Sequence, residues 1–490
     1  MYSILHISDL HRSPEDTISN AELISALVSD RQRYEREPTQ IKAPDAIVVS
    51  GDIIQGVKMD AADADAALAA QYATAREFLV ELANRFVDGD RSKVVLVPGN
   101  HDINWAKARS SMEVIAPSDP TFPKDVHGVL ASSDSVHRWD WKTRELLEIK
   151  NRAMYQSRMA AFWDFFDSFY ASTANLLKVS RGQAANLYSL WNGRIGLAAF
   201  DSCQGNDCYA FHGRIPRDAI GRAQLDLVDT GGFGLLMAVW HHNIEGPPHR
   251  SDYMDIDIVR GMIGRGFRLG LYGHQHRPDA TPMQINLATQ ETMALVSAGS
   301  LCAGFRELPT GAVRGYNVIE INDDLNGARV HFREMSVANL FTSARRASLG
   351  GASFVDLKWD LPPDLPGRAA SAQANEIAVI LESCERELKS GRPDECKRLL
   401  GPLAATLPEF GRQLLLEAAR ETDDRLLLLS LLENPRSVGE LVELIDVYMK
   451  VRNFAKARTA LDSHRERLGV EEPTLREIRA RISASEAMAK

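Results

Sequence analysis

The chain opens with the segment Ile4-Leu5-His6-Ile7-Ser8-Asp9-Leu10-His11, in which an apolar run leads into two polar side chains that can bind a metal. The run Ser3–Ser8 is short and apolar, which is typical of a strand that is buried on both faces. In an α/β sheet, ligands bind beyond the carboxyl ends of the strands. Asp9 and His11 alternate past this strand, so the segment predicts that both grip one ion there.

Four later segments repeat this arrangement of a predicted strand followed by metal-ligand residues. The strands are expected at Ala46–Ser50, Val94–Val97, Leu235–His241 and Phe267–Tyr272. The polar residues at their ends are Gly51-Asp52, Gly99-Asn100-His101-Asp102, His241-His242 and Gly273-His274-Gln275-His276. Parallel order would bring these strand ends, and therefore the side chains, to one edge.

Helical stretches separate the first three predicted strands, at Asn20–Tyr34 and Ala61–Phe86. This βαβ order predicts a largely parallel sheet that helices cover. Two later segments read as hairpins instead. One turns at Asn192-Gly193, a pair that suits a tight primed turn, and the other turns at Asn326-Gly327 and is expected to extend or pair with the first sheet.

A mixture of carboxylate and imidazole ligands favours divalent first-row ions such as Mn, Fe, Zn, Ni or Co over Mg or Ca. Asp52 follows a glycine, which permits close approach of the backbone, so its carboxylate is suited to bridge two ions. Two ions about 3.5–4 Å apart can clamp a phosphate and activate a water between them. The residue types therefore indicate phosphoester chemistry.

Taken in order, the motifs Asp-x-His, Gly-Asp, Gly-Asn-His-Asp, His and Gly-His-x-His resemble the calcineurin-like metallophosphoesterase superfamily, over about Met1 to Met335. The resemblance implies an α/β fold, in which a β-sandwich is flanked by helices (αββα). It implies an enzyme that hydrolyses a phosphoester at a dinuclear centre, with a bridging hydroxide as nucleophile. Two divalent ions are expected as cofactors, with manganese first and Fe, Zn, Ni or Co as alternatives.

The resemblance also assigns roles by position. One ion goes to Asp9, His11 and His276, the second goes to Asn100, His241 and His274, and Asp52 bridges both. His101 becomes the candidate general acid, and Asp102 the residue that orients it through a hydrogen bond.

One ligand assignment stays open. The family usually reads His-His-Pro-Pro, whereas Asn243 follows His241-His242 here and the prolines are displaced to Pro247-Pro248. We favour His241 as the ligand, with His242 as the alternative.

The expected domains are a catalytic domain at 1–340, a linker at 341–370 and an all-α domain at 371–490. Within the first, residues of about 105–185 are expected to form a helical insertion, whose aromatic stripe at Arg138–Leu177 is interpreted as core packing, or alternatively as a cap over the substrate. In the last domain, the similar segments that begin at Gly391 and Arg452 indicate helical hairpins that resemble tetratricopeptide-type repeats, with a plain helical bundle as the alternative.

Composition limits the remaining possibilities. The 490 residues include 57 Lys and Arg against 66 Asp and Glu, and the net charge of −9 argues against a broad surface that coats nucleic acid. The five cysteines form no Cys-x-x-Cys pair, which gives a disulfide framework little support. The start lacks the layout of a signal peptide, and no apolar run approaches the ~20 residues of a membrane span. We therefore expect a soluble, cytoplasmic protein with no membrane partner.

Several functions fit these patterns. The opening segment is most similar to the cyclic-nucleotide-phosphodiesterase-like and repair-nuclease branches of the superfamily. A phosphodiesterase or phosphatase that acts on a nucleotide or another small phosphoester is preferred, and a DNA or RNA nuclease is the alternative. A third hypothesis is an effector subunit whose helical domain binds a protein partner or a second copy, with hydrolysis gated by that partner.

Overall fold

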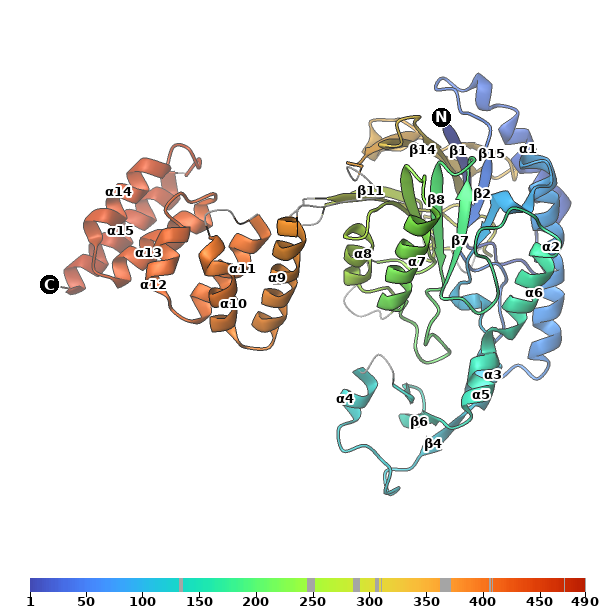
Figure 1. Cartoon of the computed structure of the whole chain (residues 1–490), viewed down its shortest axis with the longest axis horizontal. Helices are drawn as coiled ribbons and strands as arrows, with labels where there is room; N and C mark the ends of the chain where they lie inside the picture. The colour runs from blue at the N-terminus through green and yellow to red at the C-terminus, as the bar shows by residue number, and fades with distance from the viewer. Residues whose placement is uncertain are drawn as a thin grey trace. The chain divides into compact units, whose positions relative to one another are not determined.

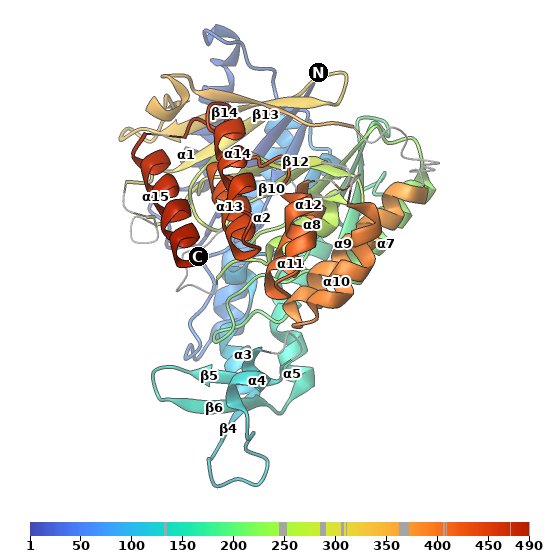
Figure 2. The same cartoon turned by 90° about the vertical axis from the view of Figure 1, so that its left-hand side faces the viewer.

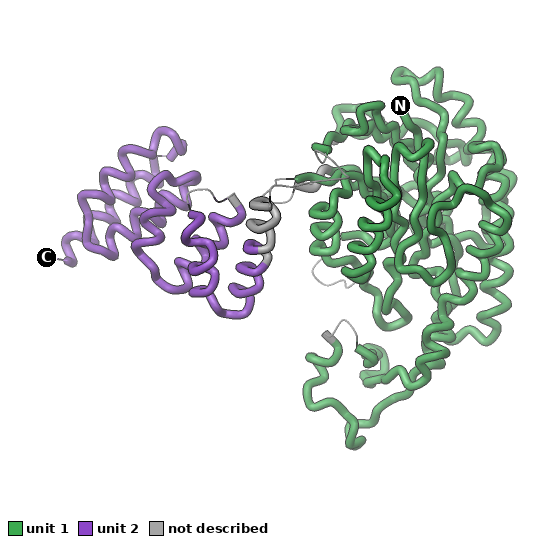
Figure 3. The backbone as a smooth tube through the Cα atoms, viewed as in Figure 1, with its two compact units in different colours: residues 1–284, 291–367 green, residues 285–290, 368–490 purple. Residues whose placement is uncertain are grey.

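The computed structural model describes residues 1–131, 135–244, 252–284, 291–304, 308–309, 311–361, 372–404, 407, 409–470 and 472–489. The chain divides into two compact units, one of residues 1–284 with 291–367 and one of residues 285–290 with 368–490 (Figure 3). All five cysteines are buried and free. Within the described residues, no helix combines the length and apolar character that a bilayer crossing requires.

The first unit contains a seven-stranded sheet in which parallel and antiparallel strands are mixed. Its order is β15-β14-β13-β1-β2-β3, and β16 pairs with β14. β1 and β2 are parallel, as are β2 and β3, whereas β13 runs antiparallel to β1, so the late hairpin extends the first sheet as predicted. The strands are β1 (Tyr2–Ile7), β2 (Ala46–Val49), β3 (Val94–Leu96), β13 (Gly315–Ile321), β14 (Gly327–Met335), β15 (Phe341–Ser343) and β16 (Phe354–Lys358).

A second sheet of six strands has the order β11-β12-β10-β9-β8-β7. Its centre is parallel, and both edge strands are antiparallel to their neighbours. The predicted turn at Asn192-Gly193 joins β7 to β8, with both residues in the left-handed region that a primed turn requires. The strands are β7 (Ala185–Leu190), β8 (Ile195–Phe200), β9 (Leu235–Val239), β10 (Phe267–Tyr272), β11 (Asp279–Gln284) and β12 (Thr292–Ser297).

One apolar core joins the two sheets, because residues of β1, β2, β8 and β9 pack into a single buried cluster. Helices lie over the sheets (Figure 1). α2 contacts β2, and α1 and α6 pack against α2, while α7 contacts β7 and α8 contacts β10. The helices are α1 (Asn20–Arg31), α2 (Ala64–Phe86), α6 (Ala160–Tyr170), α7 (Arg217–Thr230) and α8 (Ile256–Ile263). This mixed α/β sandwich confirms the predicted fold class.

The predicted helical insertion differs from the structure over its first half. Residues 112–149 contain a three-stranded antiparallel sheet, of order β4-β6-β5, that lies apart from the two main sheets (Figure 2). The expectation of a helical insertion is therefore wrong there, since the pairing of β4 and β5 with β6 decides the structure. The elements are α3 (Trp105–Ser110), β4 (Met112–Ile115), α4 (Val126–Ala131), β5 (His137–Asp140), β6 (Glu145–Ile149) and α5 (Arg152–Gln156).

The two ends of this excursion meet. The Asn104 N–H donates to the Arg158 carbonyl over 2.9 Å. The segment between these two residues therefore begins and ends at the same place in the first unit. The second half of the insertion is helical as expected. In α6, Phe162, Phe166 and Phe169 are buried in the main core, which makes this part of the aromatic stripe core packing.

The expected linker at 341–370 also differs from the structure. β15 and β16 pair with β14, so residues up to 358 complete the first sheet instead of leaving it. The sequence gives only a weak local signal for these two short strands, and their pairing with the longer strand β14 determines them. The proline-rich part of the expected linker, 362–370, lies outside the described residues.

The second unit is helical. Helices α9 and α10, α11 and α12, and α13 and α14 pack as consecutive pairs. The turn inside each pair contains a residue in the left-handed region, which is Gly391, Asp423 or Arg452. Its apolar side chains form their own buried clusters. The helices are α9 (Ala372–Lys389), α10 (Pro393–Leu400), α11 (Glu409–Glu421), α12 (Arg425–Leu431), α13 (Val438–Lys450), α14 (Phe454–His464) and α15 (Glu472–Ala489).

A buried ion pair fastens α1 to the first sheet. The Arg333 guanidinium on β14 donates two hydrogen bonds to the Asp30 carboxylate, over 2.8 and 2.6 Å, and both side chains are almost fully buried. The Tyr316 hydroxyl donates to the same carboxylate over 2.5 Å. Without Asp30, the buried Arg333 charge would keep only the carboxylate of Glu37, 2.9 Å from its other Nη atom, and would lose the bidentate pair.

We therefore predict that Asp30→Ala lowers the free energy of unfolding of the first unit by about 3–5 kcal/mol. Tryptophan fluorescence in urea measures this unit selectively, because all seven tryptophans lie between residues 105 and 359. Asp229→Ala, at an exposed position at the end of α7, serves as the control and should change stability by less than about 0.5 kcal/mol. Equal unfolding curves for the two variants would contradict the prediction.

Candidate metal centre

The polar residues predicted to form a site follow the carboxyl ends of five strands from both main sheets. Asp9 and His11 follow β1, Asp52 follows β2, Asn100 follows β3, His241 follows β9, and His274 and His276 follow β10. The structure brings all of them together. Five of these residues have positive φ angles between 45° and 75°, which are uncommon for non-glycine residues, namely Asp9, His11, Asp52, His274 and His276.

Glycines allow the strand ends to approach this closely. A Cβ atom on Gly51 would lie 2.4 Å from the Nδ1 atom of His241, and one on Gly99 would lie 2.2 Å from the Oδ1 atom of Asp52. A Cβ on Gly273 would lie 1.8 Å from the Ser8 hydroxyl. The glycines that precede the polar motifs are therefore required by contacts between different strand ends.

The first group of ligand atoms comes from Asp9, His11, Asp52 and His276, which are all buried and offer atoms within 4.8 Å of one another. The His276 Nε2 atom lies 3.3 Å from an Asp9 oxygen, and the His11 Nε2 atom lies 3.8 Å from an Asp52 oxygen. Two carboxylates and two imidazoles at this spacing fit a divalent cation.

The second group contains Asp52, His241 and His274, again with ligand atoms within 4.8 Å. The His274 Nδ1 atom lies 3.2 Å from the His241 Nε2 atom, and the Asn100 Oδ1 atom lies 2.9 Å and 3.0 Å from these two nitrogens. Two ring nitrogens and an amide oxygen thus point their electron pairs at one place, which suits a cation. Because Asp52 belongs to both groups, the donor set fits two ions that share it.

The geometry distinguishes His241 from His242. The His241 Nδ1 atom donates to the Ser50 carbonyl over 2.8 Å, which leaves Nε2 directed at the ligand cluster. Both ring nitrogens of His242 have other partners, because Nδ1 lies 2.9 Å from the Ser202 hydroxyl and Nε2 lies 3.0 Å from the Asn206 amide. This arrangement favours His241 as the ligand.

The local charges favour metal binding at the carboxylates and at His11, whereas they favour a proton on His241. Burial acts to raise the pKa of Asp9, but the nearby His276 lowers it to about 2. Burial lowers the pKa of His11 to about 3. Burial alone would lower the pKa of His241, but the Asp52 carboxylate raises it to about 9. At neutral pH the carboxylates are therefore ionised and His11 is neutral, whereas His241 carries a proton that a cation bound at its Nε2 atom would have to displace.

Asp102 does not orient the His101 ring, contrary to expectation. The His101 Nδ1 atom donates instead to the Gln55 carbonyl over 2.7 Å. The Asp102 carboxylate accepts from the Gly99 and Ile53 N–H groups and from the Tyr72 hydroxyl, so it ties the turn after β3 to the turn after β2. Burial, followed by the Asp52 charge, raises the pKa of Asp102 to about 7.

Sequence reasoning missed the groups that orient two of the predicted site residues, the ligand His241 and the candidate proton donor His101. The Ser50 carbonyl holds His241, and the Gln55 carbonyl holds His101. Gln71 on α2 holds the Gln55 loop through two hydrogen bonds to the backbone of Gly56. Backbone carbonyls produce no residue pattern, and Gln71 follows no motif, so no spacing could identify these contacts.

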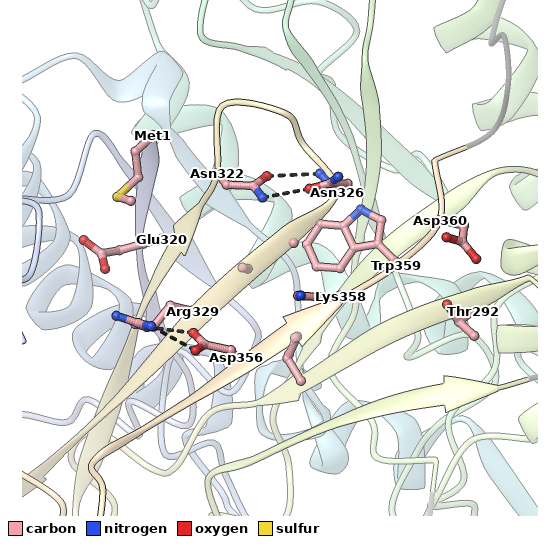
Figure 4. Close-up of a pocket in the computed structure, with 13 residues that line it drawn as sticks. Met1, Thr292, Glu320, Asn322, Asn326, Arg329, Asp356, Lys358, Trp359 and Asp360 are labelled. Carbon is pink, nitrogen blue, oxygen red and sulfur yellow. Dashed lines mark hydrogen bonds and ion pairs between the residues drawn. The ribbon is translucent and has the colours of Figure 1, made fainter.

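Two described pockets differ in their relation to this site. The pocket in Figure 4, of about 740 Å³, is lined by Met1 and by residues of β14 and β16, and contains the Arg329–Asp356 ion pair. Met1 lies before β1, whereas the ligands follow β1, so this pocket lies away from them. A second pocket, of about 470 Å³, has His101 in its wall and therefore adjoins the candidate metal centre.

We predict that Gly99→Ala displaces Asp52 and thereby reduces bound metal, because the added Cβ would overlap the Asp52 carboxylate and backbone nitrogen. Elemental analysis of protein purified without chelator measures the metal per chain. Gly439→Ala is the control, since its nearest neighbour, the Ser437 hydroxyl, lies at an ordinary 3.7 Å. A full complement of metal in the Gly99 variant would show that this close approach is dispensable.

No curated protein sequence matches the chain. The structure titled "Structure of PhoD" is 9% identical, with a TM-score of 0.38, over 70% of this chain and 68% of that one. GAP50 of Plasmodium is 11% identical (TM-score 0.34; 77% and 94% covered), and YfkN of Bacillus subtilis is 12% identical (TM-score 0.28; 73% and 90% covered). These TM-scores are too low to support an argument.

The family comparison covers the region that contains the ligands. The model of the calcineurin-like phosphoesterase family matches residues 2–278, which is more than half of the 490 residues and spans Asp9 through His276. The order of the motifs, their convergence in the structure and this match agree. The chain belongs to the calcineurin-like phosphoesterase family.

Proposed function

We propose that the protein hydrolyses phosphodiesters or phosphomonoesters with two divalent metal ions. The observation that carries this proposal is the convergence of ligand atoms from four strand ends around Asp52, with Asn100 from a fifth beside His241 and His274. Asp9, His11 and His276 would hold one ion, and Asn100, His241 and His274 the other, with Asp52 shared. Bound there, the ions supply charge neutralisation of the phosphate and an activated water.

His101 is the proposed proton donor to the leaving oxygen. Its Nδ1 atom faces the Gln55 carbonyl, which can only accept, so this nitrogen keeps its proton. The Nε2 atom is then the one that can give and regain a proton. The backbone N–H of His101 donates to Asp52 over 2.8 Å, and its ring lies 4.5 Å from the His11 ring, so it stands at the edge of the ligand cluster.

A small phosphoester, such as a nucleotide, is the preferred substrate, and a DNA or RNA strand is the alternative. The net charge of −9 disfavours broad binding of a polyanion. The pocket of about 470 Å³ beside His101 has the size of a small-molecule site.

We expect the full chain to hydrolyse bis(4-nitrophenyl) phosphate in the presence of Mn, the first metal to test. Asp52→Asn should abolish turnover and reduce bound metal, because it removes the shared charge. His101→Ala should lower kcat by about 10²-fold or more on a dinucleotide, whose alkoxide leaving group needs a proton, while metal content stays near that of the unaltered chain. Initial rates and elemental analysis of the three proteins measure both effects.

The contrast between the variants makes the assignment testable. Loss of both ions from His101→Ala would reject the role of proton donor, and full activity of Asp52→Asn would reject the dinuclear centre. Plasmid and single-stranded DNA are incubated in parallel with the full chain and Mn. Cleavage of the small diester with intact DNA supports the preferred substrate class, whereas cleavage of DNA at a higher kcat/KM supports the nuclease alternative.

We further propose that the helical unit binds a protein partner or a second copy, in the manner of tetratricopeptide-like helical hairpins. Its support is the succession of helix pairs with a left-handed residue in each turn, and the exposure of Leu426 (82%) and Met488 (89%). None of the candidate ligands lies in this unit.

A chain of residues 1–367 should therefore hydrolyse bis(4-nitrophenyl) phosphate at the rate of the full chain, since the first unit has its own core. Size-exclusion chromatography with light scattering should show self-association only when 368–490 are present, if a second copy is the occupant. Lost activity in the shorter chain would place the helical unit within catalysis itself.

A further inference from the structure

The pocket beside His101 has walls of two kinds. Apolar groups come from Val57, Ile103 and Trp105, and the polar side chains Glu15 and Lys58 lie on its exposed part. Its volume of about 470 Å³ is that of a small-ligand site, and its lining is mixed, because Ser13, Gln55, Gln71 and His101 add further polar groups.

Local hydrogen bonds fix these walls. The Gln71 amide accepts from the Gly56 N–H over 2.8 Å and donates to the Gly56 carbonyl over 3.1 Å. Gly56 also lies so close to the His101 carbonyl that a Cβ atom would stand 2.6 Å away. On the other side, the Asn104 side chain caps α3, which begins at Trp105. The pocket is therefore formed before a ligand arrives.

An aromatic row runs from the proposed proton donor to Trp105, which lines this pocket, and on to Phe211, which lines another pocket. The Trp105 ring lies 6.2 Å from the His101 ring, with 36° between their planes, and the Phe211 ring lies 6.1 Å from Trp105. Phe211 is 37% exposed, and Trp105 is partly exposed. Planar groups stack on such rings, and stacking of a nucleobase on an aromatic side chain is tolerant of base identity.

We propose that this pocket binds the leaving group of the substrate and that the leaving group is a nucleoside whose base stacks on Trp105. The inference rests on the proposed function, because a group that is protonated by His101 must lie beside His101. Lys58 offers donors and Glu15 offers acceptors, and the edge of a nucleobase presents both kinds of group. A plain hydrocarbon ring would not use them.

The reaction balances without any further reactant. Water adds its oxygen to phosphorus, and the bond between phosphorus and the nucleoside oxygen breaks. That oxygen takes the bonding electron pair and receives the proton from His101. The products are one nucleoside and one phosphomonoester, and the proton released by the attacking water restores His101.

Abasic analogues of a dinucleotide isolate the base from the rest of the leaving group. The full chain with Mn is given thymidylyl-thymidine and its two analogues in which either nucleoside is replaced by tetrahydrofuran abasic sugar. The alkoxide that leaves is the same, and product analysis identifies which side departs. We expect removal of the base on the departing side to lower kcat/KM about tenfold, while removal of the other base has a smaller effect.

Variants of Trp105 assign that preference to its ring. Trp105→Leu should abolish the difference between the base-bearing and abasic substrates, and Trp105→Phe should restore most of it, which excludes misfolding as the cause. Trp141→Leu, at a tryptophan that is 84% exposed on the insertion and does not line this pocket, is the matched control and should keep the full difference.

A binding measurement separates this inference from the proposed function. Thymidine is titrated into metal-free protein by calorimetry, and Trp105→Leu is expected to weaken its binding about tenfold relative to Trp141→Leu. Equal binding in both variants, or equal kcat/KM for base-bearing and abasic substrates, would overturn the inference. If no diester is hydrolysed although thymidine binding depends on Trp105, the proposed function and the leaving-group role fail while the nucleoside site stands.

Discussion

The Asp52 carboxylate is the interaction on which the rest of the site depends. One of its oxygens accepts the His101 N–H, and the other lies 3.2 Å from His241. It is almost fully buried, so its charge must be balanced by groups that the fold brings close. The turns after β1, β3, β9 and β10 provide these groups. At Gly51, Gly99 and Gly273 the neighbouring strand ends approach so closely that a Cβ atom would not fit.

Much of this arrangement was predictable from sequence because it obeys a local rule. Each ligand follows a short apolar run, and buried parallel strands deliver their carboxyl ends to one edge. The ligands are therefore read from residue type and position without knowledge of distances. His241 was already favoured over His242 by the resemblance, and the structure adds a physical reason, because Ser202 and Asn206 engage both ring nitrogens of His242.

The features that were missed depend on contacts between distant segments. Trp139 lies in the short strand β5 and Trp141 in the turn after it, so these two aromatic residues do not belong to the helical stripe that continues into α6. β15 and β16 are short and have no strong alternation, and pairing with β14 determines them. Asp102 binds backbone N–H groups instead of the His101 ring, a choice between acceptors that no motif encodes.

The meeting of Asn104 and Arg158 has an evolutionary consequence. An excursion whose ends are joined by a backbone hydrogen bond can be shortened, lengthened or exchanged without moving the strands on either side of it. After Arg158 the chain continues into α6 from a point beside Asn104, where the segment began. A segment with this topology can change in length or composition while the strands that carry the candidate ligands keep their places.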